Sequence, residues 1–380
     1  MTDEIKRVES KALKVETDFT EFGIDRRRTT SICLVEIETA SGLVGHGITY
    51  MADASVVARI VSAVAGPAIL SLNALDTERV SQTLHWGLTA AGQSGFACHA
   101  ISAIDLALWD IKGKRAGLPV WRMLGGARDR LDVYATLGVP FLPRDELVEM
   151  ARRVAARGFK AIKIQVGRPG LDQRDGASDL AAIIGDDVAR LGAVRDALGE
   201  DIEIAMDGSC KFDLAHAVEL AARAKPLGIG WYEEPLLGND PRLMAELRRL
   251  TGIAVSAGQS EGSLLRFREL LIHNAVDTIQ PNVTVAGGIT GCSKLAALAQ
   301  AFNIPIASGG GGCPYHNMHI QAGFANGTKV EYQTSNARAC ETLFKGYPRM
   351  EQGSLALPET PGLGFDLDPD AVASHVIGDG

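Results

Sequence analysis

Alternating hydrophobic and polar positions open the chain and predict three strands. The alternation runs over residues 5–17 and 30–38, and a Ser-Gly turn at 41–42 leads into a third segment at 43–47. A period of two is typical of strands with one buried face, so the pattern predicts a β-meander. The polar segment 18–28, with three consecutive arginines, is long for a hairpin turn and is predicted as a mobile or functional loop.

From residue 54 to 115 the apolar spacing changes to three and four, as in Ala100, Ile104, Leu108 and Ile111, which predicts helices. After residue 129 short β-rich segments alternate with amphipathic helices. The predicted strands are 132–135, 161–165, 203–206, 230–232, 254–256, 278–280, 304–307 and 330–332. The predicted helices between them include 146–157, 186–197, 214–224 and 292–301.

Eight β-α units favour an α/β fold with a (β/α)8-type barrel. A doubly wound sheet is the competing architecture, but it usually needs fewer units, and the first βα turn has no GxGxxG motif. We therefore expect an N-terminal α+β capping domain at 1–128 and a barrel at 129–356. The Pro/Gly/Asp-rich segment 357–380 is expected to pack back on the cap.

Composition narrows the function classes. The chain has 380 residues, 46% of them hydrophobic and 22% charged, which is typical of a globular protein. The net charge of −8 argues against a nucleic-acid partner. No stretch is apolar enough for a membrane span, and the first ten residues lack the apolar region of a secretory signal. Six scattered cysteines without a CxxC pair indicate neither a zinc site nor a disulfide framework, so a cytoplasmic location is expected.

Barrel active sites lie where the strands end, so the residues at those ends are the candidate chemistry. Alternation places Lys163 and Gln165 on the same side of the second strand. The third, fourth and fifth strands end at Asp207, Glu233 and Gln259. Two carboxylates and an amide on successive strands form an oxygen-rich cluster without cysteine. This composition favours a hard cation such as Mg²⁺ as the cofactor.

The order of several motifs then resembles a known family. KAIKIQVG, MDGS, WYEEP, AGQSE, QPN and NIPIASGG follow one another after AIDLALWD at 103–110, and PGLG closes the series at 361–364. This series is similar to the mandelate racemase and muconate lactonizing enzyme-like branch of the enolase superfamily. The resemblance covers essentially the whole chain. It implies proton abstraction beside the carboxylate of a small-molecule substrate, with Mg²⁺ and nearby cations stabilising an enediolate.

The resemblance also assigns roles by position. Asp207 and Glu233 match the first two metal ligands, Lys163 matches a lysine that neutralises the substrate carboxylate, and Glu331 matches a substrate-contacting acid. It implies a lyase or isomerase that dehydrates, epimerises or racemises a hydroxy-carboxylate, most plausibly a sugar acid. The segment 18–28 matches a loop that closes over the site. Even-numbered assemblies are common in this branch, so a homo-oligomer is expected.

Four positions depart from the family pattern. Gln165 stands where a proton-abstracting lysine would be, and Gln259 stands where a third metal carboxylate would be. Asn282 and Gly309 replace the aspartate and histidine of a catalytic dyad. Glutamine cannot accept a proton near neutral pH, and loss of a positioned base removes about 10²–10⁴-fold of rate.

These departures leave two main hypotheses open, beside a weaker third in which the protein has a structural role in an oligomer. In the first, the protein is an enzyme with a rebuilt site, in which Lys163, Lys211 or His316 acts as the base in place of the usual ones. In the second, the protein keeps the fold and binds a carboxylate without abstracting a proton, because fold alone does not confer function.

Overall fold

Three antiparallel strands form the N-terminal sheet of the computed structural model, which describes residues 3–88, 94–137, 142–167, 179–311 and 313–377. The strands are β1 (Ile5–Phe19), β2 (Ile24–Thr39) and β3 (Val44–Thr49), in the order β1-β2-β3. This confirms the meander that the alternating pattern predicts.

The predicted loop at 18–28 is wrong, because both strands continue through it. Only a 3₁₀ turn, Thr20–Phe22, separates β1 from β2. Phe19, Phe22 and Ile24 are buried at this tip, so apolar side chains fold the segment into a hairpin. The sequence reading gave weight to the arginines and overlooked these three apolar positions.

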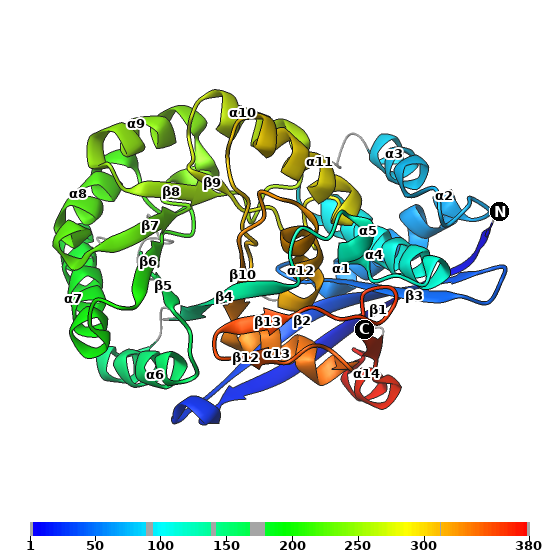
Figure 1. The fold of residues 1–380 in the computed structure, drawn as a ribbon, viewed down its shortest axis with the longest axis horizontal. Helices are drawn as coiled ribbons and strands as arrows, with labels where there is room; N and C mark the ends of the chain where they lie inside the picture. Colours follow the sequence, from blue (N-terminus) through cyan, green and yellow to red (C-terminus); the bar gives the residue numbers. More distant parts are fainter. Residues whose placement is uncertain (1–2, 89–93, 138–141, 168–178, 312, 378–380) are drawn as a thin grey trace.

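The helices of the cap lie against this sheet on one side (Figure 1). Gly45 and Gly47 of β3 contact the longest of them, because a Cβ on either glycine would lie 2.1 Å from a backbone carbonyl of Ala107 or Ala103. The absence of these two side chains lets strand and helix pack backbone to backbone. The helical segments are α1 (Ala54–Ile60), a π-helical turn (Val61–Ala65), α2 (Gly66–Ile69), α3 (Thr77–Gly87), α4 (Phe96–Ala116) and α5 (Val120–Met123).

Parallel strands and outer helices make up the second half of the chain, arranged as a ring in Figure 1. The strands pair in sequence order, and the last of them returns to pair with the first. They are β4 (Arg130–Leu137), β5 (Ala161–Gln165), β6 (Glu203–Asp207), β7 (Ile229–Glu233), β8 (Ala254–Ala257), β9 (Thr278–Ile279) and β10 (Lys329–Gln333). The helices are α6 (Arg144–Ala156), α7 (Leu180–Leu198), α8 (Leu214–Ala224), α9 (Pro241–Thr251), α10 (Leu264–Ile272), α11 (Gly288–Ala301), α12 (Pro314–Gly323) and α13 (Thr334–Leu343).

The predicted strand at 304–307 is not a regular strand. Ile306 makes single bridges to Ile279 and to Gly327, and Ala307 donates to the Ile279 carbonyl at 3.1 Å. Pro305 has no backbone N–H to donate, which prevents a continuous ladder here. The segment nevertheless occupies the place of a seventh strand between β9 and β10.

The end of the chain returns to the cap. The elements after α13 are β11 (Phe344–Lys345), β12 (Met350–Glu351), β13 (Ser354–Ala356), β14 (Asp366–Leu367) and α14 (Pro369–His375), of which β12 and β13 first extend the sheet of the second half beside β4. Val376 bridges to Leu13 of β1. Asp110 of α4 is fully buried and accepts hydrogen bonds from the backbone of His46 at 3.2 Å and of Leu363 at 2.9 Å, which joins three separate parts of the chain. No helix in the described ranges has the length and apolar character that a membrane crossing requires.

We expect Asp110→Ala to lower the free energy of unfolding by about 3 kcal/mol, because it leaves buried backbone donors unpaired. Urea denaturation measures the change. Asp366→Ala is the matched control, since its carboxylate is 75% exposed and pairs with Lys114 at 3.4 Å. Equal stability of the two variants would contradict a structural role for Asp110.

Candidate functional site

Aligned strand ends bring the candidate residues together. In the parallel register Gln165 of β5 lies beside Asp207 of β6, Asp207 beside Glu233 of β7, and Glu233 beside Ser256 of β8. Neighbouring positions in a parallel sheet present their side chains on the same face. The order of the strands therefore places Gln165, Asp207 and Glu233, which are far apart in the sequence, side by side.

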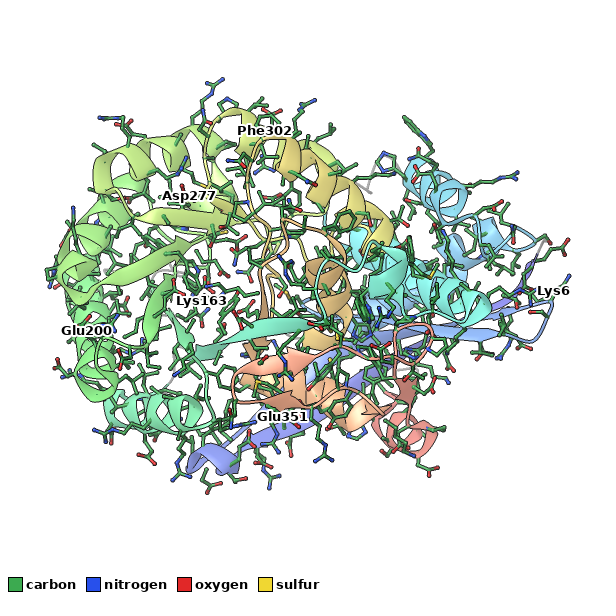
Figure 2. The ribbon with its side chains drawn as sticks, viewed as in Figure 1. Lys6, Lys163, Glu200, Asp277, Phe302 and Glu351 are labelled. Carbon is green, nitrogen blue, oxygen red and sulfur yellow. The ribbon has the colours of Figure 1, made fainter. Side chains whose placement is uncertain are left out.

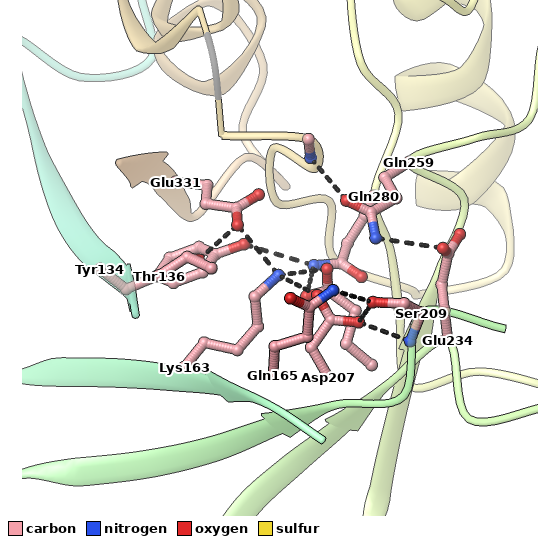
Figure 3. A network of polar contacts seen from close by, with 12 residues as sticks. Tyr134, Thr136, Lys163, Gln165, Asp207, Ser209, Glu234, Gln259, Gln280 and Glu331 are labelled. Carbon is pink, nitrogen blue, oxygen red and sulfur yellow. Dashed lines mark hydrogen bonds and ion pairs between the residues drawn. The ribbon is translucent and has the colours of Figure 1, made fainter. Parts of the chain in front are cut away.

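Lys163, two residues before Gln165 on β5, contacts the carboxylates of this region. Its Nζ contacts a carboxylate oxygen of Glu233, and lies 3.0 Å from Glu331 Oε1 and 3.4 Å from Asp207 Oδ2. Figure 2 places Lys163 inside the ring of strands, whereas Glu200 lies at the periphery. Figure 3 shows Lys163 and Glu331 pointing toward one another. Lys163 is thus grouped with carboxylates from three other strands, and its side chain is fully buried.

The charges of this cluster do not balance. Three buried carboxyl groups surround one ammonium group, so the cluster carries two more negative than positive charges only when all three carboxyls are ionised. Burial alone would lower the pKa of Lys163, but the carboxylates of Glu233 and Glu331 raise that pKa well above its usual value. Burial raises the pKa of the Glu233 carboxyl, while Lys163 acts in the opposite direction. The site thus favours an additional cation.

Amide and hydroxyl groups hold the carboxylates in place. Gln280 Nε2 donates to Glu233 Oε2 at 2.6 Å, and Thr136 donates to Glu331 Oε1. The other oxygen of Glu331 and the side-chain oxygen of Gln280 are buried without a hydrogen-bond partner among the described residues. Buried acceptors of this kind usually bind water or a ligand.

Gln165 is fixed by the turn that follows β6. Its Nε2 donates to Ser209 Oγ at 2.8 Å, and the Ser209 backbone N–H donates to Asp207 Oδ1 at 2.8 Å. Ser209 and Cys210 both have positive φ angles, 46° and 59°, which are strained for residues other than glycine. Strained backbone is often retained at functional sites. The amide nitrogen of Gln165 is thus occupied, and its oxygen remains as an acceptor.

Both polar atoms of the Gln259 side chain make hydrogen bonds within the site. Its Oε1 accepts from the Gly310 backbone N–H at 3.0 Å, and its Nε2 donates to Glu234 Oε2 at 3.1 Å. Burial raises the pKa of the Glu234 carboxyl, and Gln259 partly offsets this rise. Within the described residues, no three His, Cys, Asp or Glu side chains converge as a ready metal site.

Asn282 is part of the buried framework. Its side-chain oxygen accepts from the Thr284 backbone N–H at 3.0 Å and from Asn317 Nδ2 at 3.2 Å, and its Nδ2 donates to the Tyr50 hydroxyl at 3.3 Å. These contacts occupy the amide fully, so Asn282 positions neighbouring chain segments.

Two predicted site residues lie elsewhere. His316 of α12 is fully buried and packs its ring against Phe344 and Phe365, and burial lowers the pKa of this histidine well below its usual value. It therefore faces an aromatic cluster, because the helix begins directly after the glycine run and turns the side chain inward. Lys211 follows the strained turn after β6, and its backbone N–H donates to the Gly208 carbonyl at 3.0 Å. Neither residue is among the described residues that line the pocket at the strand ends.

The glycine run leaves no space for a histidine. A Cβ on Gly309 would lie 2.5 Å from the Gln259 Cβ and 2.9 Å from the Gln280 carbonyl oxygen. Gly312, the last glycine of the run, lies outside the described residues. The packing around Gln259 therefore excludes a larger side chain at position 309.

Gly309→Ala is expected to destabilise the protein by about 2 kcal/mol, since the added methyl group has to displace Gln259 or the backbone. Urea denaturation again gives the comparison. Gly87→Ala serves as the control, because a Cβ there meets no heavy atom within 4 Å. A Gly309→Ala protein as stable as the wild type would mean that the loop is not packed as described.

The site opens into a pocket of about 440 Å³. Such a volume suits a single small ligand. Its lining includes Gln165, Asp207, Gln259 and Glu331, which the sequence identifies. It also includes residues that sequence reasoning missed: Arg28, Thr136, Ser209, Gln333 and Asn336. Thr136 was missed because the predicted strand stops at 135, and Arg28 because its segment was interpreted as a loop.

Comparisons with known proteins agree with this geometry. Residues 8–125 match the model of the mandelate racemase / muconate lactonizing enzyme N-terminal domain, and residues 146–371 match the enolase C-terminal domain-like model. The chain is 30% identical over 377 residues to a 3,6-anhydro-alpha-L-galactonate cycloisomerase of Streptomyces coelicolor, covering 96% of this chain and 99% of that protein.

Solved structures superimpose on nearly the whole chain. A racemase of Streptomyces coelicolor A3(2) with bound magnesium superimposes with a TM-score of 0.86 at 29% identity, covering 98% of this chain and all of that one. The L-talarate dehydratase of Polaromonas sp. JS666, complexed with Mg and L-glucarate, has a TM-score of 0.84 at 29% identity, covering 99% and 98% of the two chains.

Proposed function

Because this chain belongs to the mandelate racemase and muconate lactonizing enzyme branch of the enolase superfamily, we propose that it is a Mg²⁺-dependent lyase or isomerase acting on a sugar acid. The observation that carries the proposal is the row of carboxylates around Lys163 at the strand ends. Relatives named as a cycloisomerase and a dehydratase of sugar acids support the substrate class.

The donor set fits Mg²⁺ in both charge and chemistry. With all three carboxyl groups around Lys163 ionised, their excess negative charge equals the charge of one divalent cation, and such a cation would favour that ionised state. Mg²⁺ in proteins is commonly held by one or two carboxylates, with water and substrate completing its coordination. Asp207 and Glu233 would hold the ion, with Gln259 as a neutral neighbour. When bound, the ion would stabilise negative charge that develops on the substrate carboxylate.

The residues of the chain supply binding and positioning. Lys163 is protonated and buried, so it is suited to contact the substrate carboxylate as a fixed positive charge. The unpartnered oxygen of Glu331 can accept a hydrogen bond from a substrate hydroxyl. Gln165, held by Ser209, presents an oxygen that orients a hydroxyl or a water but cannot remove a proton.

A second candidate function is a carboxylate-binding protein without proton abstraction. The specific observation that favours it is that the described residues lining the pocket include no histidine and no lysine. Lys163 is not among these described lining residues, and it is paired with carboxylates that keep it charged. The groups of the described lining that could accept a proton are its carboxylates and the Cys210 thiol, whose pKa is raised by burial.

Exchange of the α-proton separates the two functions. The wild type is incubated in ²H₂O with Mg²⁺ and a panel of aldonic and aldaric acids, and ²H incorporation and 2-keto product are followed by NMR and mass spectrometry. Incorporation or dehydration of any acid supports the enzyme. Binding of an acid with neither exchange nor dehydration across the panel supports the carboxylate-binding alternative.

A further inference from the structure

One arginine of the hairpin faces the pocket. Arg28 of β2 lines it together with Gln333 and Asn336 of the β10–α13 segment. Its position is fixed by the pairing of Arg28 with Thr17 in the hairpin, where the Thr17 hydroxyl also donates to the Ser335 carbonyl at 3.3 Å. The hairpin is thus tied to the same segment that contributes the opposite part of the wall.

The neighbouring arginines show that Arg28 differs from them. Arg26 pairs with Glu146 at 3.1 Å, and Arg27 pairs with Glu16 at 2.9 Å. The Arg28 guanidinium makes no ion pair or hydrogen bond with any residue in the described part of the chain, although the side chain is half-buried. Burial lowers the pKa of Arg28, which reflects a cation that has lost water without gaining a carboxylate partner.

An unpaired, partly desolvated guanidinium in a ligand pocket is a binding group for an anion. A planar carboxylate can accept two parallel N–H bonds from it. The residues next to it, Gln333 and Asn336, are neutral, so a single negative charge is suited to this part of the wall. The other charged groups that line the pocket, Asp207, Glu234 and Glu331, are acidic and belong to the strand ends.

We propose that Arg28 binds a second carboxylate of the substrate, so that the protein selects a dicarboxylic sugar acid over a monocarboxylic one. This inference rests on the proposed function, in which the first carboxylate lies at Lys163. The two positive groups then bind opposite ends of one molecule: the strand ends hold the reacting carboxylate and the hairpin holds the distal one. An acid that ends in a neutral hydroxymethyl group leaves Arg28 unpaired and so binds more weakly.

Calorimetry with matched acids tests the proposal. Aldaric and aldonic acids of the same configuration, in the gluco, galacto and manno series, are titrated into the full chain with Mg²⁺, together with the 6-phosphates of the aldonic acids. We expect an aldaric acid to bind most tightly, and Arg28→Met to weaken it by about 10- to 100-fold while leaving the aldonic acid unchanged. Arg28→Lys, which keeps the charge but loses the planar fork, should give an intermediate loss.

Arg27→Met is the matched control, because this neighbour is 70% exposed and paired within the hairpin. It should change neither affinity, and thermal melting establishes that all variants fold. Equal affinities for the aldaric and aldonic acids, insensitive to Arg28→Met, would overturn the role of Arg28 and leave the proposed function intact. A 6-phosphate that binds more tightly than every aldaric acid would also overturn it. If no acid of any series binds the wild type, both proposals fail.

Discussion

Asp207→Asn should weaken Mg²⁺ binding by at least about 100-fold and abolish any turnover of a sugar acid. The substitution removes one of the two charges that would hold the ion, yet it keeps an acceptor for the Ser209 backbone N–H. Calorimetric titration with Mg²⁺, repeated with Mn²⁺, measures the affinity directly. Because the readout is metal uptake, the result does not depend on identifying the substrate.

Asp213→Asn provides the control for this experiment. Asp213 caps α8 by accepting from the His216 backbone N–H at 2.9 Å, and asparagine is an equally good cap. This variant makes the same acid-to-amide change six residues away, outside the described pocket lining, and should bind Mg²⁺ as the wild type does. Undiminished metal uptake by Asp207→Asn would show that the strand-end carboxylates are not the metal site.

Gln165→Lys should increase the rate of α-proton exchange of a bound sugar acid by about 10²–10⁴-fold. The substitution places an amine at a pocket-lining position on the same face of β5 as Lys163. A positioned base is worth a rate factor of this size. Exchange is followed by NMR in ²H₂O with the aldaric acid that binds most tightly.

Gln165→Met is the matched control, since it has a similar length but neither a base nor a hydrogen bond to Ser209. It should bind the acid and show no gain in exchange. If Gln165→Lys retains the acid but exchanges no faster than Gln165→Met, the α-proton does not lie on the β5 side of the pocket. The feature that limits the rate of α-proton exchange would then lie at another position in the site.

The positions of the strand-end residues can be predicted well from the sequence, because each position depends on a short stretch of neighbouring residues. Lys163 and Gln165 share a face through simple alternation, and each of Asp207 and Glu233 ends a short buried strand. Parallel pairing then aligns these ends without further information. The helix α8 is predicted with the boundaries that the structure has, since its apolar spacing begins at an aspartate cap.

Features that depend on tertiary packing could not be obtained in this way. The hairpin of β1 and β2 exists because Phe19, Phe22 and Ile24 become buried, and the local sequence does not show what covers them. The inward position of His316 follows from the direction in which α12 leaves the glycine run. The hydrogen bonds of Gln259 to Gly310 and Glu234 likewise join segments far apart along the chain.

The hairpin has a consequence for how this protein can diversify. Its tip is anchored by buried aromatic residues and by the Arg26–Glu146 ion pair, while Arg28, further along the same strand, lines the pocket. Different side chains of the same hairpin therefore anchor the hairpin and select the substrate. A substitution at Arg28 alone would therefore change substrate choice while leaving the folding of the cap and the strand-end site unchanged.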